Sequence, residues 1–171
     1  MKRILAVGVL LLCLMSSQIA RSDEKRDAKI KAEMVENYLL WQEAYKFRDA
    51  ERMISFESPD FTTILLDGDV VSKLYSDITL RDTIGRIKKV YVAQVGIKKL
   101  AIEPNRIVVL SSHRYDYDIL GINNQLHHIS GTHQSRDIWV EYDRVWMLKR
   151  TEALNGKILI DGKSYSWKRD N

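Results

Sequence analysis

Apolar positions follow two different rhythms along this chain, first the period of a helix and later that of a strand. In the first third they recur at spacings of four, four, three and four residues, as Ile30, Met34, Tyr38, Trp41 and Tyr45. Such a stripe covers one face of a helix. We therefore expect a helix that follows a frayed, charged lead-in over 23–29 and pauses at Arg48-Asp49.

Shorter elements are expected next. Asp49 has the side chain of an N-cap, so it should begin a second helix over 50–56, which Ser58-Pro59 would end. The run over 61–66 is rich in β-forming residues, and Asp67-Gly68 after it is a hairpin signal. A strand and a tight turn are therefore predicted.

The return strand and a third helix complete the first half. Val70-Val71 is the predicted return strand, and the helix begins either at Ser72 or at Thr79. Thr79 with Asp82 is similar to a capping box. Helical spacing continues beyond it in Leu80, Ile84, Ile87 and Tyr91.

From Gly96 onward the pattern predicts strands separated by turn residues. Four are expected: Lys98–Glu103, Arg106–Leu120, Gln125–Val140 and Val145–Leu154. Gly131 is expected to form a bulge in the third of them. Asn155-Gly156 and Asp161-Gly162 are read as turns that bound a small hairpin of 158–160 with 164–167.

Helices followed by a run of antiparallel strands are typical of the α+β class. Strands as long as these imply a strongly curved sheet. We therefore expect a cone-shaped, strongly curved antiparallel sheet with the N-terminal helices packed on its concave face and a hollow between the two layers.

The first 22 residues have the pattern of a signal peptide. Lys2 and Arg3 precede an apolar run over 4–15, and Ala20-Arg21-Ser22 has small residues at the −3 and −1 positions of a cleavage site. The run is shorter than the ~20 residues that a spanning helix needs. We expect a secreted protein, periplasmic or extracellular, with no stable membrane anchor after cleavage; an uncleaved anchor is the alternative.

Removal of this segment changes the charge and the cysteine content. The 27 basic residues fall to 24 against 23 acidic ones, so the net charge falls from +4 to +1, and Cys13 is lost. Neither nucleic-acid binding nor thiol chemistry is then indicated. No metal site is expected, because the adjacent His127 and His128 point to opposite faces of a strand.

The order of elements resembles the nuclear transport factor 2-like superfamily, in particular its SnoaL-like branch and related secreted domains. The matching pieces are Trp41 with Asp49, the Ser-Pro-Asp-Phe of 58–61, and Arg136–Val140 with Trp146. The resemblance implies a domain over 23–157, with a C-terminal hairpin and tail over 158–171. Where the family usually has Asp-Gly in its last hairpin turn, this chain has Asp143-Arg144.

What the superfamily does varies widely, from cofactor-free isomerases, dehydratases and cyclases to binding and assembly domains. Its enzymes commonly use a carboxylate, His or Tyr inside the cone. The aspartate of the ketosteroid isomerase-like members would fall near Leu65 or Leu66 here, which speaks against that chemistry.

Candidate site residues lie on the two longest predicted strands. In 106–120 the odd positions share one face, which grades from apolar residues to His113, Tyr115 and Tyr117. Which face of 125–140 points inward stays open. The predicted ligand pocket consists of Trp41, Tyr45, His113, Tyr115, Tyr117, His133 and Trp139.

A catalytic hypothesis and a structural one compete for these side chains. In the first, His113 with Asp137 is a general base and Tyr115 donates to a carbonyl. In the second, His113 is a satisfied sheet residue, the tyrosines pack across strands, and Asp137 pairs with an arginine.

Three functions follow in order of preference. The first is binding of a small, partly apolar ligand in the cone without covalent chemistry. The second is a cofactor-free lyase, isomerase or hydrolase. The third is an assembly module that forms a homodimer through the sheet, which an exposed Trp139 would favour.

Overall fold

The computed structural model describes residues 2–165, with side chains from Glu24 onward. The chain divides into two compact units, Met1–Glu36 and Asn37–Asn171. Nothing in the structure tests cleavage after residue 22, which stays a prediction. The last two residues of the predicted 164–167 strand lie outside the described residues. Among the side chains that are described, no helix is long and apolar enough to cross a membrane.

Helix α1 runs without a break from Lys2 to Phe47, so the frayed lead-in expected over 23–29 is wrong. That segment contains neither Gly nor Pro, and its Glu, Lys, Arg and Ala residues are good helix formers. The pause at Arg48 is confirmed, because this residue adopts a φ of 59° that ends the helix.

Two shorter helices follow in the second unit. Helix α2 spans Ala50–Ile54, and the Asp49 side chain accepts a hydrogen bond from the Arg52 backbone N–H at 3.0 Å, which confirms the predicted cap. Helix α3 spans Lys73–Arg86 with Ser72 at its N-cap, so the alternative start at Thr79 is wrong. Thr79 lies inside the helix and caps nothing.

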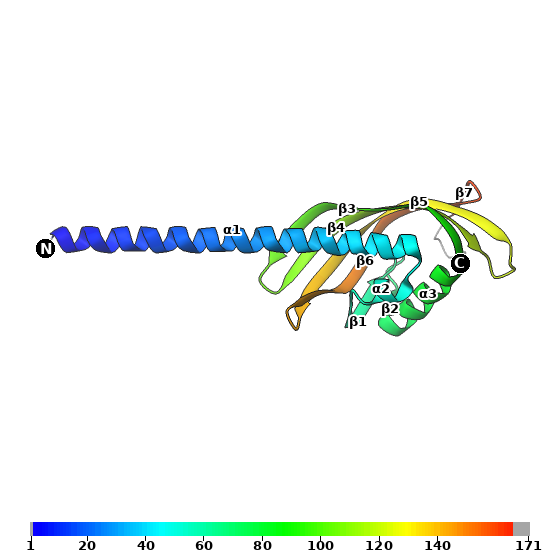
Figure 1. Ribbon diagram of the computed structural model, residues 1–171, viewed down its shortest axis with the longest axis horizontal. Helices are drawn as coiled ribbons and strands as arrows, with labels where there is room; N and C mark the ends of the chain where they lie inside the picture. Colours follow the sequence, from blue (N-terminus) through cyan, green and yellow to red (C-terminus); the bar gives the residue numbers. More distant parts are fainter. Residues whose placement is uncertain (1, 166–171) are drawn as a thin grey trace. The chain divides into compact units, whose positions relative to one another are not determined.

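One curved, unclosed sheet carries seven strands, with β2-β1-β6-β5-β4-β3 as its order and β7 paired to β6 (Figure 1). All pairs are antiparallel except β1 with β6. The strands are β1 Glu57–Ile64, β2 Val70–Ser72, β3 Ile87–Glu103, β4 Arg106–Leu120, β5 Leu126–Tyr142, β6 Val145–Ile160 and β7 Lys163–Tyr165. The expected α+β class and curved sheet are confirmed.

Strand β3 begins at Ile87, so the helical reading of Ile87 and Tyr91 and the strand start at Lys98 are wrong. The spacing of Leu80, Ile84, Ile87 and Tyr91 fits a helix, but Val90, Tyr91 and Val92 also favour a strand. Pairing along the whole length of β4 decides between the two.

Strand β5 pairs with β4 in one unbroken register, so the bulge expected at Gly131 is wrong. A Cβ at Gly131 would lie 2.7 Å from the Tyr115 hydroxyl and 2.6 Å from the Lys157 carbonyl oxygen. The glycine is therefore required by the close approach of β4 and β6 rather than by a bend in its own strand.

Of the other predicted turn dipeptides, two form turns and one does not. Leu65 and Asp69 close the β1–β2 turn, and Gly68 adopts a φ of 88° there, as predicted. Asp161 and Gly162 form the β6–β7 turn with φ values of 52° and 78°. Asn155-Gly156 is not a turn, because β6 runs through it; the pairing of β6 with β5 only shifts register between Ala153 and Asn155.

Strand β1 begins at Glu57, four residues before its predicted start, and includes Pro59. Its register with β6 shifts between Glu57 and Thr62. Proline has no N–H to donate to a neighbouring strand. Because the register of β1 with β6 shifts here, no such donor is needed at this position.

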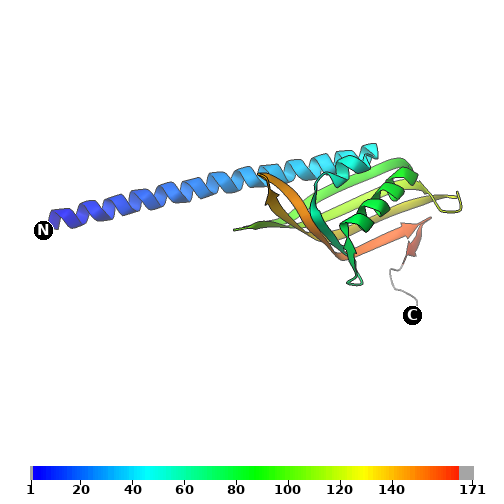
Figure 2. The same ribbon diagram turned by 90° about the horizontal axis from the view of Figure 1, so that it is seen from below.

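A small core fixes the helices to the sheet within the second unit. Ala44 of α1, Met53 of α2, Ile84 of α3 and Ile87 of β3 are at most 3% exposed and pack together. Figure 2 shows α3 lying across one face of the strands. The last turns of α1 contact the same face, since Trp41 meets His113 and Tyr45 meets Tyr117, so the expected packing on the concave face is confirmed.

Candidate functional site

Strands β4 and β5 form the floor of the concave face. Their register places His113 opposite His133 and Ser111 opposite Ser135. The odd positions of both strands therefore share one face, which resolves the inward face of β5. The imidazoles of His113 and His133 stack with centroids 4.2 Å apart and planes inclined by 7°.

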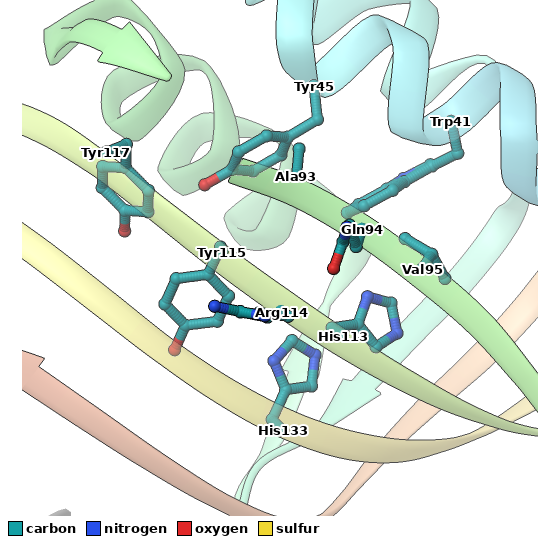
Figure 3. Close-up of a pocket in the computed structure, with 10 residues that line it drawn as sticks. All are labelled: Trp41, Tyr45, Ala93, Gln94, Val95, His113, Arg114, Tyr115, Tyr117 and His133. Atoms are coloured by element: carbon teal, nitrogen blue, oxygen red, sulfur yellow. The ribbon is translucent and has the colours of Figure 1, made fainter. Parts of the chain in front are cut away.

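Aromatic rings from α1 lie above this floor. Figure 3 shows Trp41 and Tyr45 extending from the helix toward His113, Tyr117 and their neighbours on the sheet. Trp41 meets His113 edge-on at 5.7 Å, and Tyr45 meets Tyr117 at 6.1 Å. These rings border a hollow of about 160 Å³, which Tyr115 and His133 also line.

Asp137 is buried beside this floor, with 3% of its surface exposed. Its Oδ2 accepts hydrogen bonds from the Tyr38 hydroxyl at 2.5 Å and from Ser111 Oγ at 2.8 Å. Its Oδ1 is buried, and no described residue forms a hydrogen bond to it. Burial raises the pKa of this carboxyl, and the hydroxyl donors counteract the shift only in part.

The structural hypothesis expected an arginine beside Asp137, but none pairs with it among the described residues. Arg136, the neighbouring residue, points to the other face and bonds to Glu152 at 3.0 Å. The partners of Asp137 are hydroxyl groups, which cannot neutralise its charge. This part of the structural hypothesis is therefore wrong.

A chain of hydrogen bonds links His113 to Asp137 through Ser111. Ser111 Oγ lies 3.0 Å from His113 Nε2 and 2.8 Å from Asp137 Oδ2, and 2.7 Å from Ser135 Oγ. Burial lowers the pKa of His113 to about 4 and that of His133 to about 4, the latter with a contribution from His113. Both imidazoles are therefore neutral near pH 7.

A second hollow of about 230 Å³ lies beside Asp137, and we call it the Asp137 hollow. It is lined by Tyr38, Trp41, Glu57, Phe61, Thr63, Ser76, Leu80, His113, His133, Ser135, Asp137, Trp139, Leu148 and Thr151. A third, of about 260 Å³, extends from His133 past Tyr115 to Leu65 and Leu66. His133 borders all three hollows, so it stands where they adjoin.

An ion cluster stands at one wall of the Asp137 hollow. Lys73 Nζ lies 2.9 Å from Glu57 Oε2 and 2.9 Å from Asp77 Oδ1. Burial raises the pKa of Glu57 to about 7 despite the ammonium group, and the repulsion from Asp77 adds to the shift. Two carboxylates therefore share one cation.

The residues predicted from sequence come together in this region. Trp41, Tyr45, His113, Tyr115, Tyr117 and His133 line the first hollow, while Trp139 and Asp137 line the Asp137 hollow. Their functional role stays a prediction. Among the described side chains, no three His, Cys, Asp or Glu residues are grouped as around a metal ion.

Four polar residues of the site were missed. Tyr38 was read only as part of an apolar helical stripe, although its position one turn before Trp41 already placed it on the buried face. Ser111 and Ser135 occur at odd positions of the two strands, so the alternation that selected His113 also indicated them. Glu57 carried no periodic signal.

Comparison with known proteins identifies the fold. No protein-family model and no curated protein match the chain. A nuclear transport factor 2-like protein from Cytophaga hutchinsonii superposes with a TM-score of 0.59 at 15% identity, covering 72% of this chain and 95% of the other.

Two further solved structures agree. One is a nuclear transport factor 2-like protein of unknown function in nutrient uptake from Rhodospirillum rubrum, with a TM-score of 0.57, 14% identity and coverage of 70% and 95%. The other, from Shewanella baltica, has a TM-score of 0.51, 13% identity and coverage of 78% and 94%. The chain therefore has the fold of the nuclear transport factor 2-like superfamily.

Proposed function

We propose that this protein binds a small, partly apolar molecule in the hollows of its concave face without forming a covalent bond to it. The observation that carries the proposal is the Asp137 hollow. It combines aromatic and aliphatic walls with a buried carboxyl whose Oδ1 has no hydrogen-bond partner in the described part of the chain. Ligand sites generally have such mostly apolar walls with a few convergent polar groups.

The size of the hollow limits the ligand. An engineered cavity of about 150 Å³ accepts benzene. The Asp137 hollow, at about 230 Å³, therefore has room for one ring with a short polar substituent. Fold likeness supports only a general binding role, because this fold hosts unrelated functions. The name of the Rhodospirillum rubrum protein, which mentions nutrient uptake, agrees with such a role.

Calorimetric titration with two probes, 2-phenylethanol and 2-phenylethylamine, tests this proposal. Ser76 lines the hollow from α3 and is half-buried, so Ser76→Trp should fill it and abolish binding. Thr79→Trp places the same ring at an exposed position of the same helix and should leave binding unchanged. If neither probe binds, or if Ser76→Trp binds both as well as the wild type does, the proposal fails.

A cofactor-free lyase, isomerase or hydrolase is the second candidate, and the hydrogen-bond chain from His113 through Ser111 to Asp137 favours it. A neutral His113 would accept a substrate proton while Asp137 fixes the orientation of Ser111, and Tyr115 would donate to a carbonyl. Turnover that survives His113→Ala would reject this mechanism.

Export completes the proposal. We propose that residues 1–22 are removed and that the mature protein acts in the periplasm or outside the cell, because the positive start, apolar run and small residues of this segment agree with a signal peptide. The mass of the exported protein should correspond to a chain that begins at Asp23. An intact N-terminus on the exported protein would contradict cleavage.

Homodimer formation through the sheet stays a prediction. An exposed Trp139 would have favoured a dimer. This residue is instead 3% exposed and packs against Tyr38 with ring centroids 5.7 Å apart. Sedimentation equilibrium of the purified protein would test the dimer directly.

A further inference from the structure

The chemical class of the ligand follows from the charges around the Asp137 hollow, provided that the proposed binding function holds. Among the described residues that line the hollow, the acids are Glu57 and Asp137, and none is Lys or Arg. The His113 and His133 imidazoles are neutral near pH 7, because burial lowers the pKa of each to about 4. They therefore supply no positive charge.

Lys73, which bonds to Glu57 at the wall of the hollow, does not balance this negative charge. Lys73 bonds to Glu57 and to Asp77 at 2.9 Å each, so that cluster is itself negative when both acids are ionised. Asp137 accepts hydrogen bonds from Tyr38 and Ser111, and the hydroxyls of Ser135 and Thr151 also lower its pKa, but all of these groups are neutral. Among the described residues, none bonds to its Oδ1. A positive ligand would therefore meet complementary charge at two sides of the Asp137 hollow.

The walls also fit a cation. Trp41, Phe61 and Trp139 line the hollow together with Tyr38. The face of an aromatic ring attracts an ammonium group, most strongly when both are removed from water. The same rings accept an apolar substituent, so they suit an amine with a small hydrocarbon group better than they suit an anion.

We propose that the Asp137 hollow binds an organic ammonium ion that carries a small apolar group, with the ammonium paired to the Asp137 carboxylate. Burial raises the pKa of Asp137, so the empty hollow favours the protonated acid. The ammonium ion reverses this preference, and the proton of the carboxyl group passes to solvent as the ion pair forms. Tyr38, Glu57, His113 and His133 are the other titratable groups that line the hollow.

Titration of the full chain with 2-phenylethylamine and with 2-phenylethanol tests this proposal. The two probes differ only in their polar group, so the ratio of their dissociation constants measures the selectivity for charge. We expect the amine to bind at least about tenfold more tightly, as a charged hydrogen bond replaces a neutral one. Repeating the titration in buffers of different ionisation enthalpy should reveal proton release with the amine alone.

Two variants test whether Asp137 causes the preference for the amine. Asp137→Asn keeps the shape of the side chain and should remove the preference for the amine, while the alcohol still binds. Asp143→Asn makes the same change in an exposed turn, at a φ of 46° that asparagine tolerates, and should change neither constant.

The outcomes separate this inference from the proposed function. Binding of the alcohol as tightly as the amine, or retained selectivity in Asp137→Asn, overturns the ammonium proposal and leaves ligand binding intact. Binding of neither probe overturns both. The comparison of the two probes on the wild type needs no variant, so it decides the question even if Asp137→Asn does not fold.

Discussion

Tyr38 donates its phenolic hydrogen to Oδ2 of Asp137 at 2.5 Å, between residues 99 positions apart in the chain. The same hydroxyl accepts a hydrogen bond from Trp139 Nε1 at 3.3 Å. Burial and, next to it, the charge of Asp137 raise the pKa of Tyr38, so the phenol stays a donor. This contact joins α1 to β5 and positions the buried acid of the proposed site.

Removal of the donor should cost stability. We expect Tyr38→Phe to lower the free energy of unfolding by about 1–3 kcal/mol, because Asp137 loses a partner inside the protein. Urea denaturation measures the difference. Tyr142→Phe is the matched control, since Tyr142 is 45% exposed, and it should have little effect. Equal losses in both variants would show that the buried contact contributes nothing specific.

The two stacked histidines predict a loss of stability in acid. Their pKa in the unfolded chain is near 6.5 and falls to about 4 in the fold. The stabilisation from each is complete above about pH 6.5 and declines as the pH falls through about 4, by up to about 2 kcal/mol between pH 7 and 5. His133→Phe should therefore make the loss between these pH values smaller.

His128 is the control for this experiment, because the fold shifts its pKa in the opposite direction. Its hydrogen bond to Asp118 raises its pKa, so it contributes stability at low pH that declines as the pH rises. His128→Gln should make the loss of stability on acidification larger. A His133→Phe curve parallel to that of the wild type would contradict the burial of a neutral imidazole.

The raised pKa of Glu57 predicts a loss of stability as the pH rises. Burial raises its pKa from 4.5 to about 7, so its contribution is complete below about pH 4.5 and declines as the pH rises through about 7. Glu57→Gln should reduce the loss of unfolding free energy between pH 5 and 8. Glu141→Gln, at an exposed position, should not. A Glu57→Gln curve parallel to that of the wild type would contradict the raised pKa of Glu57.

Two glycines predict opposite effects of the same substitution. Gly131→Ala should destabilise by about 1–3 kcal/mol, because the new Cβ would lie 2.6 Å from the Lys157 carbonyl oxygen. Gly85 lies within α3, and no described atom outside the adjoining backbone of that helix would lie within 4 Å of a Cβ there, so Gly85→Ala should stabilise by about 0.5–1 kcal/mol. Urea denaturation of both variants tests the pair, and a stabilising Gly131→Ala would contradict the close approach of Tyr115.

The sequence predicts correctly those elements whose two ends are marked by turn residues. Strand β4 was predicted with its observed bounds, Arg106–Leu120, because Pro104-Asn105 and Gly121–Asn124 mark both of them. The start of β3 was missed, since Ile87–Val95 satisfies both periods and only pairing with β4 distinguishes them. Asn155-Gly156 was misread because a turn dipeptide can also lie in a long strand.

The site was predictable as a face and not as a set of contacts. Alternation along β4 placed His113, Tyr115 and Tyr117 together. It could not supply the register of β5 that sets His133 against His113, nor the bond from Tyr38 to Asp137. Both depend on how distant segments meet, and local sequence does not encode that.

The central claim is that a small molecule occupies the Asp137 hollow. A crystal structure of the protein with saturating 2-phenylethylamine tests it most directly. We predict the ring between Trp41 and Trp139, with its ammonium group within hydrogen-bond distance of Asp137. An empty hollow, with the probe bound elsewhere on the protein, would contradict the account.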